Sequence, residues 1–265
     1  MADTPTADTP TPPEGATALV VLSSGEIVWG RGIGATGKTV GECCFNTSMT
    51  GYQEILTDPS YAGQIITFTF PHVGNVGTNP DDIETTTLAA RGLILRADIT
   101  HPSNWRATQH LDGWLKSHNL IGLAGVDTRR LTRLIRDAGA PTGALCHSSD
   151  GQFDIDALKQ TAAAWPGLEG MDLAKELTCR QTYGWDETLW QLHEGYRRLG
   201  DKDARFNVVA IDYGAKRNIL RSLASAGCRV TVVPATESAE AVLHHKPDGI
   251  FLSNGPGDPA ATGVY

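Results

Sequence analysis

From residue 206 onward the sequence alternates between short apolar runs and amphipathic stretches. Three runs have the pattern of buried strands: 207–211, 229–234 and 250–252. A helix that begins at Ala215 and has Gly227 at its C-terminal cap lies between the first two, and a helix capped by Thr236 lies between the last two. This β-α-β-α-β order predicts parallel strands joined by right-handed crossovers, and therefore an α/β fold for this part of the chain.

The third run continues into a turn that contains two glycines and two prolines. The sequence there is Gly255-Pro256-Gly257-Asp258-Pro259. Glycine lets a ligand approach the backbone closely, and proline fixes the direction of the chain, so the remaining N–H groups have set orientations. Such a turn at the carboxyl end of a parallel strand is either a cradle for an anion or developing oxyanion, or a tight connector.

Composition places the chain among globular proteins and excludes some partners. The 265 residues include 22 Lys and Arg against 30 Asp and Glu, which gives a formal net charge of −8. This charge argues against nucleic acid or an anionic membrane as the main partner, and we expect neither. The five cysteines form no metal-ligand spacing, so they predict reduced thiols in a cytoplasmic protein with no metal site.

The first part of the chain mixes strands and helices without regular alternation. Residues 1–16 are low in apolar side chains and predict a disordered tail. We expect a β-hairpin over 19–29, a turn-rich passage over 30–41, and further strands and helices: strands at 64–70, 92–95 and 143–146, and helices within 105–119, from Asp127 or Thr128, and over 154–164. The predicted organisation is a mixed α/β domain over 17–150, a connecting segment over 151–204 and a parallel-sheet domain over 205–265.

Three polar features of the first domain have alternative interpretations. The stretch 45–61 is rich in hydroxyl and amide side chains, and either lines a site or satisfies its own turns, of which composition favours the second. His72 lies among turn residues and is expected to be a structural hydrogen-bonding group. The arginines of the helix after Asp127 form either a solvated face or a partner contact, and the solvated face is the commoner case.

Several motifs, taken together and in order, resemble the small, glutamine-hydrolysing subunit of carbamoyl-phosphate synthase. They are the segments 45–61, 71–77, 126–133, 170–175, 212–218 (Asp-Tyr-Gly-Ala-Lys-Arg-Asn) and 252–259. The resemblance runs from about residue 18 to residue 260. It implies a small-subunit N-terminal domain followed by a class I glutamine amidotransferase domain.

The resemblance also implies partners and site residues. Ser60 would contact the substrate L-glutamine, Gly255 and Gly257 would shape its pocket, and the Gly255 N–H would face a developing oxyanion. Ammonia released in this family passes to a large subunit, which uses ATP and Mg²⁺ to make carbamoyl phosphate for arginine and pyrimidine synthesis. No cofactor is therefore expected in this chain itself.

The chain departs from the family pattern after the glycine turn. The family's nucleophilic cysteine and its His–Glu pair follow that turn, and no matching positions precede Tyr265. The second domain is therefore expected to be cut short. Cys228 lies at the opposite end of its strand from the turn and has no base or helix N-terminus beside it, so it is not expected to substitute.

Three expectations follow for the chain by itself. As a glutaminase part, it would not release ammonia from glutamine alone. As a docking module, its first domain would bind the large subunit without catalysis. A cut-short sheet would also leave an unpaired edge, which predicts aggregation and proteolysis after about residue 200.

Overall fold

The computed structural model describes residues 10–263, which divide into two compact units. The first unit consists of residues up to 50, 64–79 and 91–166, and the second of residues 51–63, 80–90 and 167 onward. The units are therefore not continuous in sequence. The domain boundaries that the sequence suggests stay a prediction, and the tail expected over 1–16 lies largely outside the described residues.

The first unit contains a closed barrel. Its strands and helices are β1 (Ala18–Leu22), β2 (Ile27–Gly34), β3 (Gly37–Asn46), β4 (Gln64–Phe68), β5 (Gly92–Ile94), α2 (Leu111–Ser117), β6 (Ile121–Ala124), α3 (Thr128–Ala138), β7 (Thr142–His147) and α4 (Ile155–Ala164). Among the described residues, the barrel order is β1-β2-β6-β5-β4-β3-β7, and β7 pairs with β1 to close it. The three contacts β3–β4, β4–β5 and β5–β6 are parallel.

The predicted hairpin is confirmed, because β1 and β2 pair antiparallel. The expected turn-rich passage over 30–41 is wrong, since β2 and β3 occupy most of it. Gly34 and Gly37 do flank a tight turn between these strands and have positive φ, but Gly30 permits close strand contact instead: a Cβ there would lie 2.3 Å from the Ala124 carbonyl oxygen on β6. Where a barrel strand lies this close to its neighbour, there is no room for a side chain, so the position requires glycine. In the sequence, such a glycine looks like a turn residue.

Both faces of β1 are buried, and the two faces belong to different clusters. Ala18, Val20 and Leu22 join a cluster to which α3 contributes Leu131 and Ile135. Leu19 and Val21 pack on the opposite face against α4. The predicted half-buried strand at 64–70 is likewise almost fully buried as β4, because the barrel and its covering helices leave it no solvated face.

The second unit contains an open sheet. Its elements are α1 (Tyr52–Thr57), η1 (Pro59–Tyr61), α5 (Leu173–Leu177), β8 (Tyr183–Trp185), β9 (Phe206–Asp212), α6 (Arg217–Ser225), β10 (Cys228–Pro234), α7 (Ala239–His244), β11 (Gly249–Leu252) and η2 (Pro259–Thr262). The order within the described residues is β11-β9-β10-β8, with β9 parallel to both β10 and β11 as predicted.

The connecting segment contributes a strand that the sequence did not predict. β8 pairs antiparallel with β10, so it forms an edge of this sheet. Its three residues, Tyr-Gly-Trp, are too few for a period to be visible in the sequence. The second helix also differs from expectation, because the side chain of Ser238, not Thr236, caps α7 by accepting from the Ala241 N–H.

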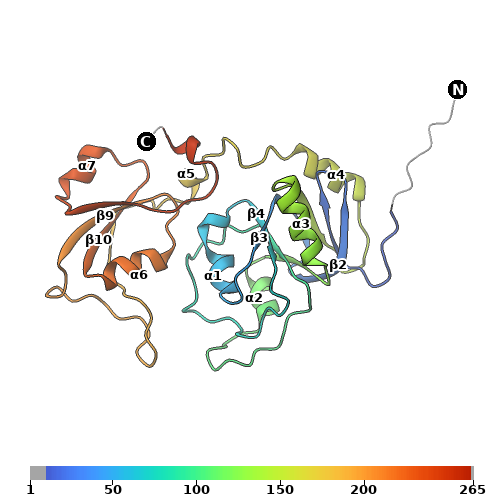
Figure 1. Ribbon diagram of the computed structural model, residues 1–265, viewed down its shortest axis with the longest axis horizontal. Helices are drawn as coiled ribbons and strands as arrows, with labels where there is room; N and C mark the ends of the chain where they lie inside the picture. Colours follow the sequence, from blue (N-terminus) through green and yellow to red (C-terminus); the bar gives the residue numbers. More distant parts are fainter. Residues whose placement is uncertain (1–9, 264–265) are drawn as a thin grey trace. The chain divides into compact units, whose positions relative to one another are not determined.

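Helices cover the two faces of the open sheet. α6 and α7 lie on opposite sides of β9 and β10 (Figure 1). Phe251 of β11 packs with the α6-side cluster, whereas Ile250 and Leu252 pair in register with Val209 and Ile211 of the α7-side cluster. Ile250 is 49% and Leu252 63% exposed, so the α7 side of this edge strand is uncovered.

No helix within residues 10–263 is both long and apolar enough to cross a membrane.

Candidate functional site

The glycine turn after β11 has the geometry that its composition suggests. A Cβ at Gly255 would lie 2.5 Å from the Tyr213 carbonyl oxygen, so only glycine fits there. Gly257 has a φ of +75°, which lies in the left-handed region that favours glycine. Asp258 then caps η2 by accepting from the Ala260 N–H at 2.9 Å, and this ends the turn.

The amides of the turn remain available for a ligand. Within residues 10–263, the N–H groups of Gly255 and Gly257 donate to no other group of the protein. Gly255 is exposed and Gly257 is partly exposed. Internal hydrogen bonds therefore do not occupy these N–H groups, which remain available to a ligand as the cradle interpretation requires.

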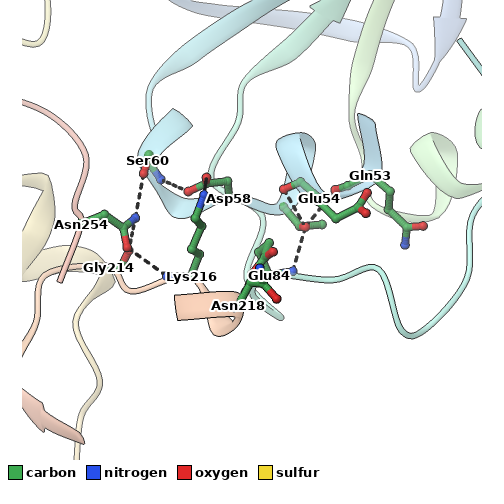
Figure 2. A network of polar contacts seen from close by, with 10 residues as sticks. Gln53, Glu54, Asp58, Ser60, Glu84, Gly214, Lys216, Asn218 and Asn254 are labelled. Atoms are coloured by element: carbon green, nitrogen blue, oxygen red, sulfur yellow. Dashed lines mark hydrogen bonds and ion pairs between the residues drawn. The ribbon is translucent and has the colours of Figure 1, made fainter. Parts of the chain in front are cut away.

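Asn254 connects this turn to two other segments of the second unit (Figure 2). Its Nδ2 donates to Ser60 Oγ at 2.8 Å and to the Gly214 carbonyl oxygen at 3.1 Å. Its Oδ1 accepts from the Lys216 N–H at 3.2 Å. One amide side chain thus joins the segment after β11 to the turn after β9 and to a segment 194 positions earlier.

Ser60 is held from its other side by Asp58. The Asp58 carboxylate accepts from the Ser60 N–H at 2.9 Å and caps η1. Its second oxygen lies 3.4 Å from Lys216 Nζ. The Asp58 side chain is only 12% exposed, so this ion pair is better shielded from solvent than the surface pairs of the chain. Asp58 and Asn254, the two hydrogen-bond partners of Ser60 in this network, therefore both contact Lys216 at the start of α6.

The long polar stretch 45–61 is not a simple loop, because α1 and η1 occupy its second half. Its hydroxyl groups do satisfy local structure, as composition favoured: Thr57 Oγ1 donates to the Gln53 carbonyl oxygen at 2.8 Å. Ser60 departs from that pattern because its hydroxyl accepts from Asn254, which is distant in sequence.

Glu84 attaches a further distant segment to the start of α6 (Figure 2). Its Oε2 accepts from the Asn218 N–H at 2.8 Å, and its own N–H donates to Thr57 Oγ1 at 3.0 Å. Its carbonyl oxygen accepts from the Arg217 N–H at 3.1 Å. Burial raises the pKa of this carboxyl, against the opposing effects of the Asn218 hydrogen bond and the charges of Arg221 and Lys216.

Asp212 shapes the turn that carries Gly214 and Lys216. One of its carboxylate oxygens accepts from the Gly214 and Ala215 N–H groups, at 2.9 Å and 2.7 Å, and the other accepts from the Cys179 N–H at 2.7 Å. The carboxylate is buried and satisfied by three backbone donors, which is the arrangement that makes a buried charge tolerable.

A cavity of about 420 Å³ lies beside this turn. Glu84, Asp212, Gly214 and Arg217 line it together with residues of the segment 176–185. Gly255 and Gly257 are not among its lining residues, although the Gly255 Cα lies 3.8 Å from where a Gly214 Cβ would be. The cavity is therefore a neighbour of the glycine turn and not its interior.

Four of the five cysteines are poor nucleophiles, because burial raises the pKa of Cys43, Cys44, Cys146 and Cys179. Burial raises the pKa of Cys43 and Cys44 to about 12, and burial together with Asp212 raises that of Cys179 to about 11. Cys228 begins β10, whereas the glycine turn follows the other end of the parallel strands, as the sequence predicted. The described residues contain no group of three or more His, Cys, Asp or Glu side chains that could hold a metal ion.

Sequence reasoning named Ser60, Gly255 and Gly257 but did not single out the residues that connect them. Asn254 and Lys216 stand inside motifs that were quoted, so the motifs themselves were the available signal. Asp58 was detectable as a cap before Pro59. Glu84 had no signal, because it reaches α6 from a segment without helix or strand.

Comparisons with known proteins match both parts of the chain. Residues 20–145 match the family model "Carbamoyl-phosphate synthase small chain, CPSase domain", and residues 209–264 match "Glutamine amidotransferase class-I". Proteins named "Carbamoyl phosphate synthase small chain" from Bradyrhizobium diazoefficiens and Rhizobium meliloti are 63% identical over 254 residues and 62% identical over 253 residues. Each alignment covers 94% of this chain and 63% of the relative, so the chain spans less than two thirds of these relatives' length.

A solved aminopeptidase from Aneurinibacillus sp. strain AM-1 aligns over 91% of this chain and 57% of its own at 9% identity. The TM-score of 0.28 is too low for that likeness to carry an argument about fold or site.

Proposed function

Since this chain belongs to the carbamoyl phosphate synthase small chain family, we propose that it carries the glutamine-recognition half of a glutaminase site that feeds ammonia to a large synthetase chain. In this proposal L-glutamine is the substrate, and the large chain uses ATP and Mg²⁺ to make carbamoyl phosphate in the cytoplasm. The product then enters arginine and pyrimidine synthesis.

The observation that carries the proposal is the hydrogen bond between Asn254 and Ser60. It holds the serine expected to contact glutamine 2.8 Å from the residue that precedes the glycine turn. This bond links the Ser60 hydroxyl to the turn in which the Gly255 and Gly257 N–H groups donate to no other described residue. Preorganised donors of this kind are what a carboxamide needs when negative charge develops on its oxygen.

The proposal assigns no nucleophile to residues 1–265. A thiol attacks as the thiolate, and the raised pKa values of Cys43, Cys44, Cys146 and Cys179 keep these thiols protonated at neutral pH. Cys228 begins β10 and therefore lies at the opposite end of the parallel strands from the glycine turn. We therefore expect this chain by itself to bind glutamine and to release no ammonia from it.

Saturation-transfer NMR with L-glutamine tests the recognition step. Signal transfer is expected for the unchanged chain and is expected to fall strongly in Ser60→Ala, with Ser24→Ala, an exposed serine of the first unit, as the matched control. Equal transfer in both variants would contradict the role of Ser60. Ammonia release above background that disappears in Cys228→Ala would overturn the statement that no nucleophile is present.

A second candidate function is that of a docking module for the large chain. The exposed arginines of α3 favour it, because a chain of net charge −8 concentrates positive charge there. Co-elution with a large carbamoyl phosphate synthase chain in size-exclusion chromatography is the expected result. Separate elution at micromolar concentrations would count against this function.

A further inference from the structure

A hollow of about 400 Å³ on the first unit is lined by three arginines and three threonines. Its lining residues are Thr69, Pro71, Arg96, Thr128, Arg129, Thr132 and Arg133. β4 and β5 are parallel neighbours in the barrel, so Thr69 and Arg96 follow them at the same rim. α3 packs against β3 and β4 and brings Arg129 and Arg133, one turn apart, to the same place.

The charges of this hollow are only partly balanced by the residues that the structure describes. Two other arginines of α3 have close partners, since Arg130 pairs with Glu26 at 2.6 Å and Arg136 with Asp137 at 2.8 Å. Arg129 and Arg133 form no ion pair with any residue in 10–263. Arg96 pairs with Asp127 at 3.5 Å, and Arg133 interacts with the Asp137 carboxylate through its charge without a close ion pair. Like charges one helical turn apart repel, so their neighbourhood favours an external anion.

We propose that this hollow receives an acidic side chain, Asp or Glu, from a segment of the large carbamoyl phosphate synthase chain. The proposal rests on the docking role described above and names the surface that performs it. The partner's carboxylate would accept from the guanidinium groups, while the threonine methyl groups, Pro71 and the arginine stems would contact the aliphatic part of the segment.

The openness of the three arginines to solvent favours a protein partner over a small anion. All three side chains are exposed, so water and salt would screen a free ion there. A partner surface excludes that water, and a planar guanidinium that binds a carboxylate through two N–H groups is then most effective. Arginine is enriched at protein interfaces for this reason. The overall negative charge of the chain disfavours nucleic acid as the occupant.

The test compares charge reversals on one helix. Arg129→Glu changes a lining residue and places a negative charge in the first turn of α3, where it favours the helix, so weaker binding cannot come from a lost helix. Arg133→Glu is the second variant. Arg136→Glu is the matched control, because it makes the same charge change on α3 outside the hollow.

Association with a purified large chain is measured by biolayer interferometry at low and at physiological ionic strength. We expect Kd to rise about tenfold or more in Arg129→Glu and Arg133→Glu, with a weaker dependence on salt, and to change about twofold or less in Arg136→Glu. If the unchanged chain associates and all three variants bind alike, the assignment of the hollow is overturned while the docking role stands. If the unchanged chain does not associate, the docking role fails first.

A single-stranded DNA oligonucleotide serves as the competing probe. No binding to it is expected. Binding that both lining variants abolish, together with unchanged association with the large chain, would overturn the assignment in favour of a nucleic-acid surface.

Discussion

The two units of this chain solve the problem of strand edges in different ways. The barrel of the first unit closes on itself through β1 and β7, so its strands are paired on both sides. The sheet of the second unit ends at β11, whose α7 side exposes Ile250 and Leu252. Edge strands with exposed apolar side chains invite pairing or covering by other segments.

This difference bears on where stability and function lie. The barrel has buried side chains on both faces of β1, whereas the open sheet carries the Asn254–Ser60 network and the glycine turn at its carboxyl edge. The relatives continue beyond the part that this chain matches, since it covers 63% of them. The open sheet is therefore the unit that carries the proposed glutamine site, and the barrel is the unit with the better covered strands.

The largest expected effect is a difference in unfolding free energy between a substitution in a barrel strand and one in the edge strand of the open sheet. Leu93 of β5 is fully buried, whereas Leu252 of β11 is 63% exposed. Leu93→Ala leaves a cavity in the barrel and is expected to lower its unfolding free energy by about 2–5 kcal/mol. Leu252→Ala is expected to change stability by less than about 0.5 kcal/mol.

Hydrogen exchange followed by mass spectrometry measures both variants unit by unit, with the unaltered unit as the internal control. Similar losses in the two variants would mean that β11 is as well covered as the barrel interior.

Two strand glycines provide a smaller and more local comparison. A Cβ at Gly92 of β5 would lie 2.6 Å from the Ile121 carbonyl oxygen, whereas one at Gly184 of β8 would meet nothing within 4 Å. Gly92→Ala is expected to cost about 1–3 kcal/mol through overpacking. Gly184→Ala is expected to be neutral or to stabilise the open sheet by a few tenths of a kcal/mol, on the order of the entropy effect in unfolded chains. Urea unfolding of both variants checks this, and a neutral Gly92→Ala would show that the barrel yields at β5.

The third prediction concerns pH and is confined to the second unit. Because the pKa of Glu84 is raised by burial above its usual 4.5, the folded state binds this proton more tightly than the unfolded state does. Its contribution to stability is therefore full below pH 4.5 and is lost as pH rises through the raised value. Glu84→Gln keeps an acceptor for the Asn218 N–H but cannot titrate, so α6 should lose that part of its pH dependence.

Amide exchange in α6 measured across this pH range distinguishes the two proteins, and the barrel amides serve as the control. An identical pH profile in Glu84→Gln would show that another group carries the dependence.

The smallest effect is a difference in thiol reactivity. Thiolate fractions at about pH 8 differ by about tenfold between a thiol with a pKa near 12 and one near 11. Cys43, which is fully buried, should therefore resist iodoacetamide more than Cys179 does. Mass mapping of alkylated peptides over time checks the order. Fast modification of Cys43 in the native chain would mean that the barrel opens readily.

Local sequence was sufficient wherever a period or a cap is visible within a few residues. The β1–β2 hairpin, the parallel β9–β10–β11 set and the cap at Asp127 were all predictable in this way. Prediction failed over much of residues 30–41, where a glycine that permits close strand contact, such as Gly30, looks like a turn residue in the sequence, and at β8, which is too short to show a period.

By itself, the sequence determined which segments are apolar enough to become strands and helices, and it determined the backbone freedom of the turn at Gly255 and Gly257. Those properties depend on each residue and its near neighbours. Only the tertiary structure decided that β7 closes the barrel onto β1, and that Asn254 meets Ser60 across 194 positions. Hydrogen bonds between distant segments form when the packed core brings those segments together, so no local pattern announces them.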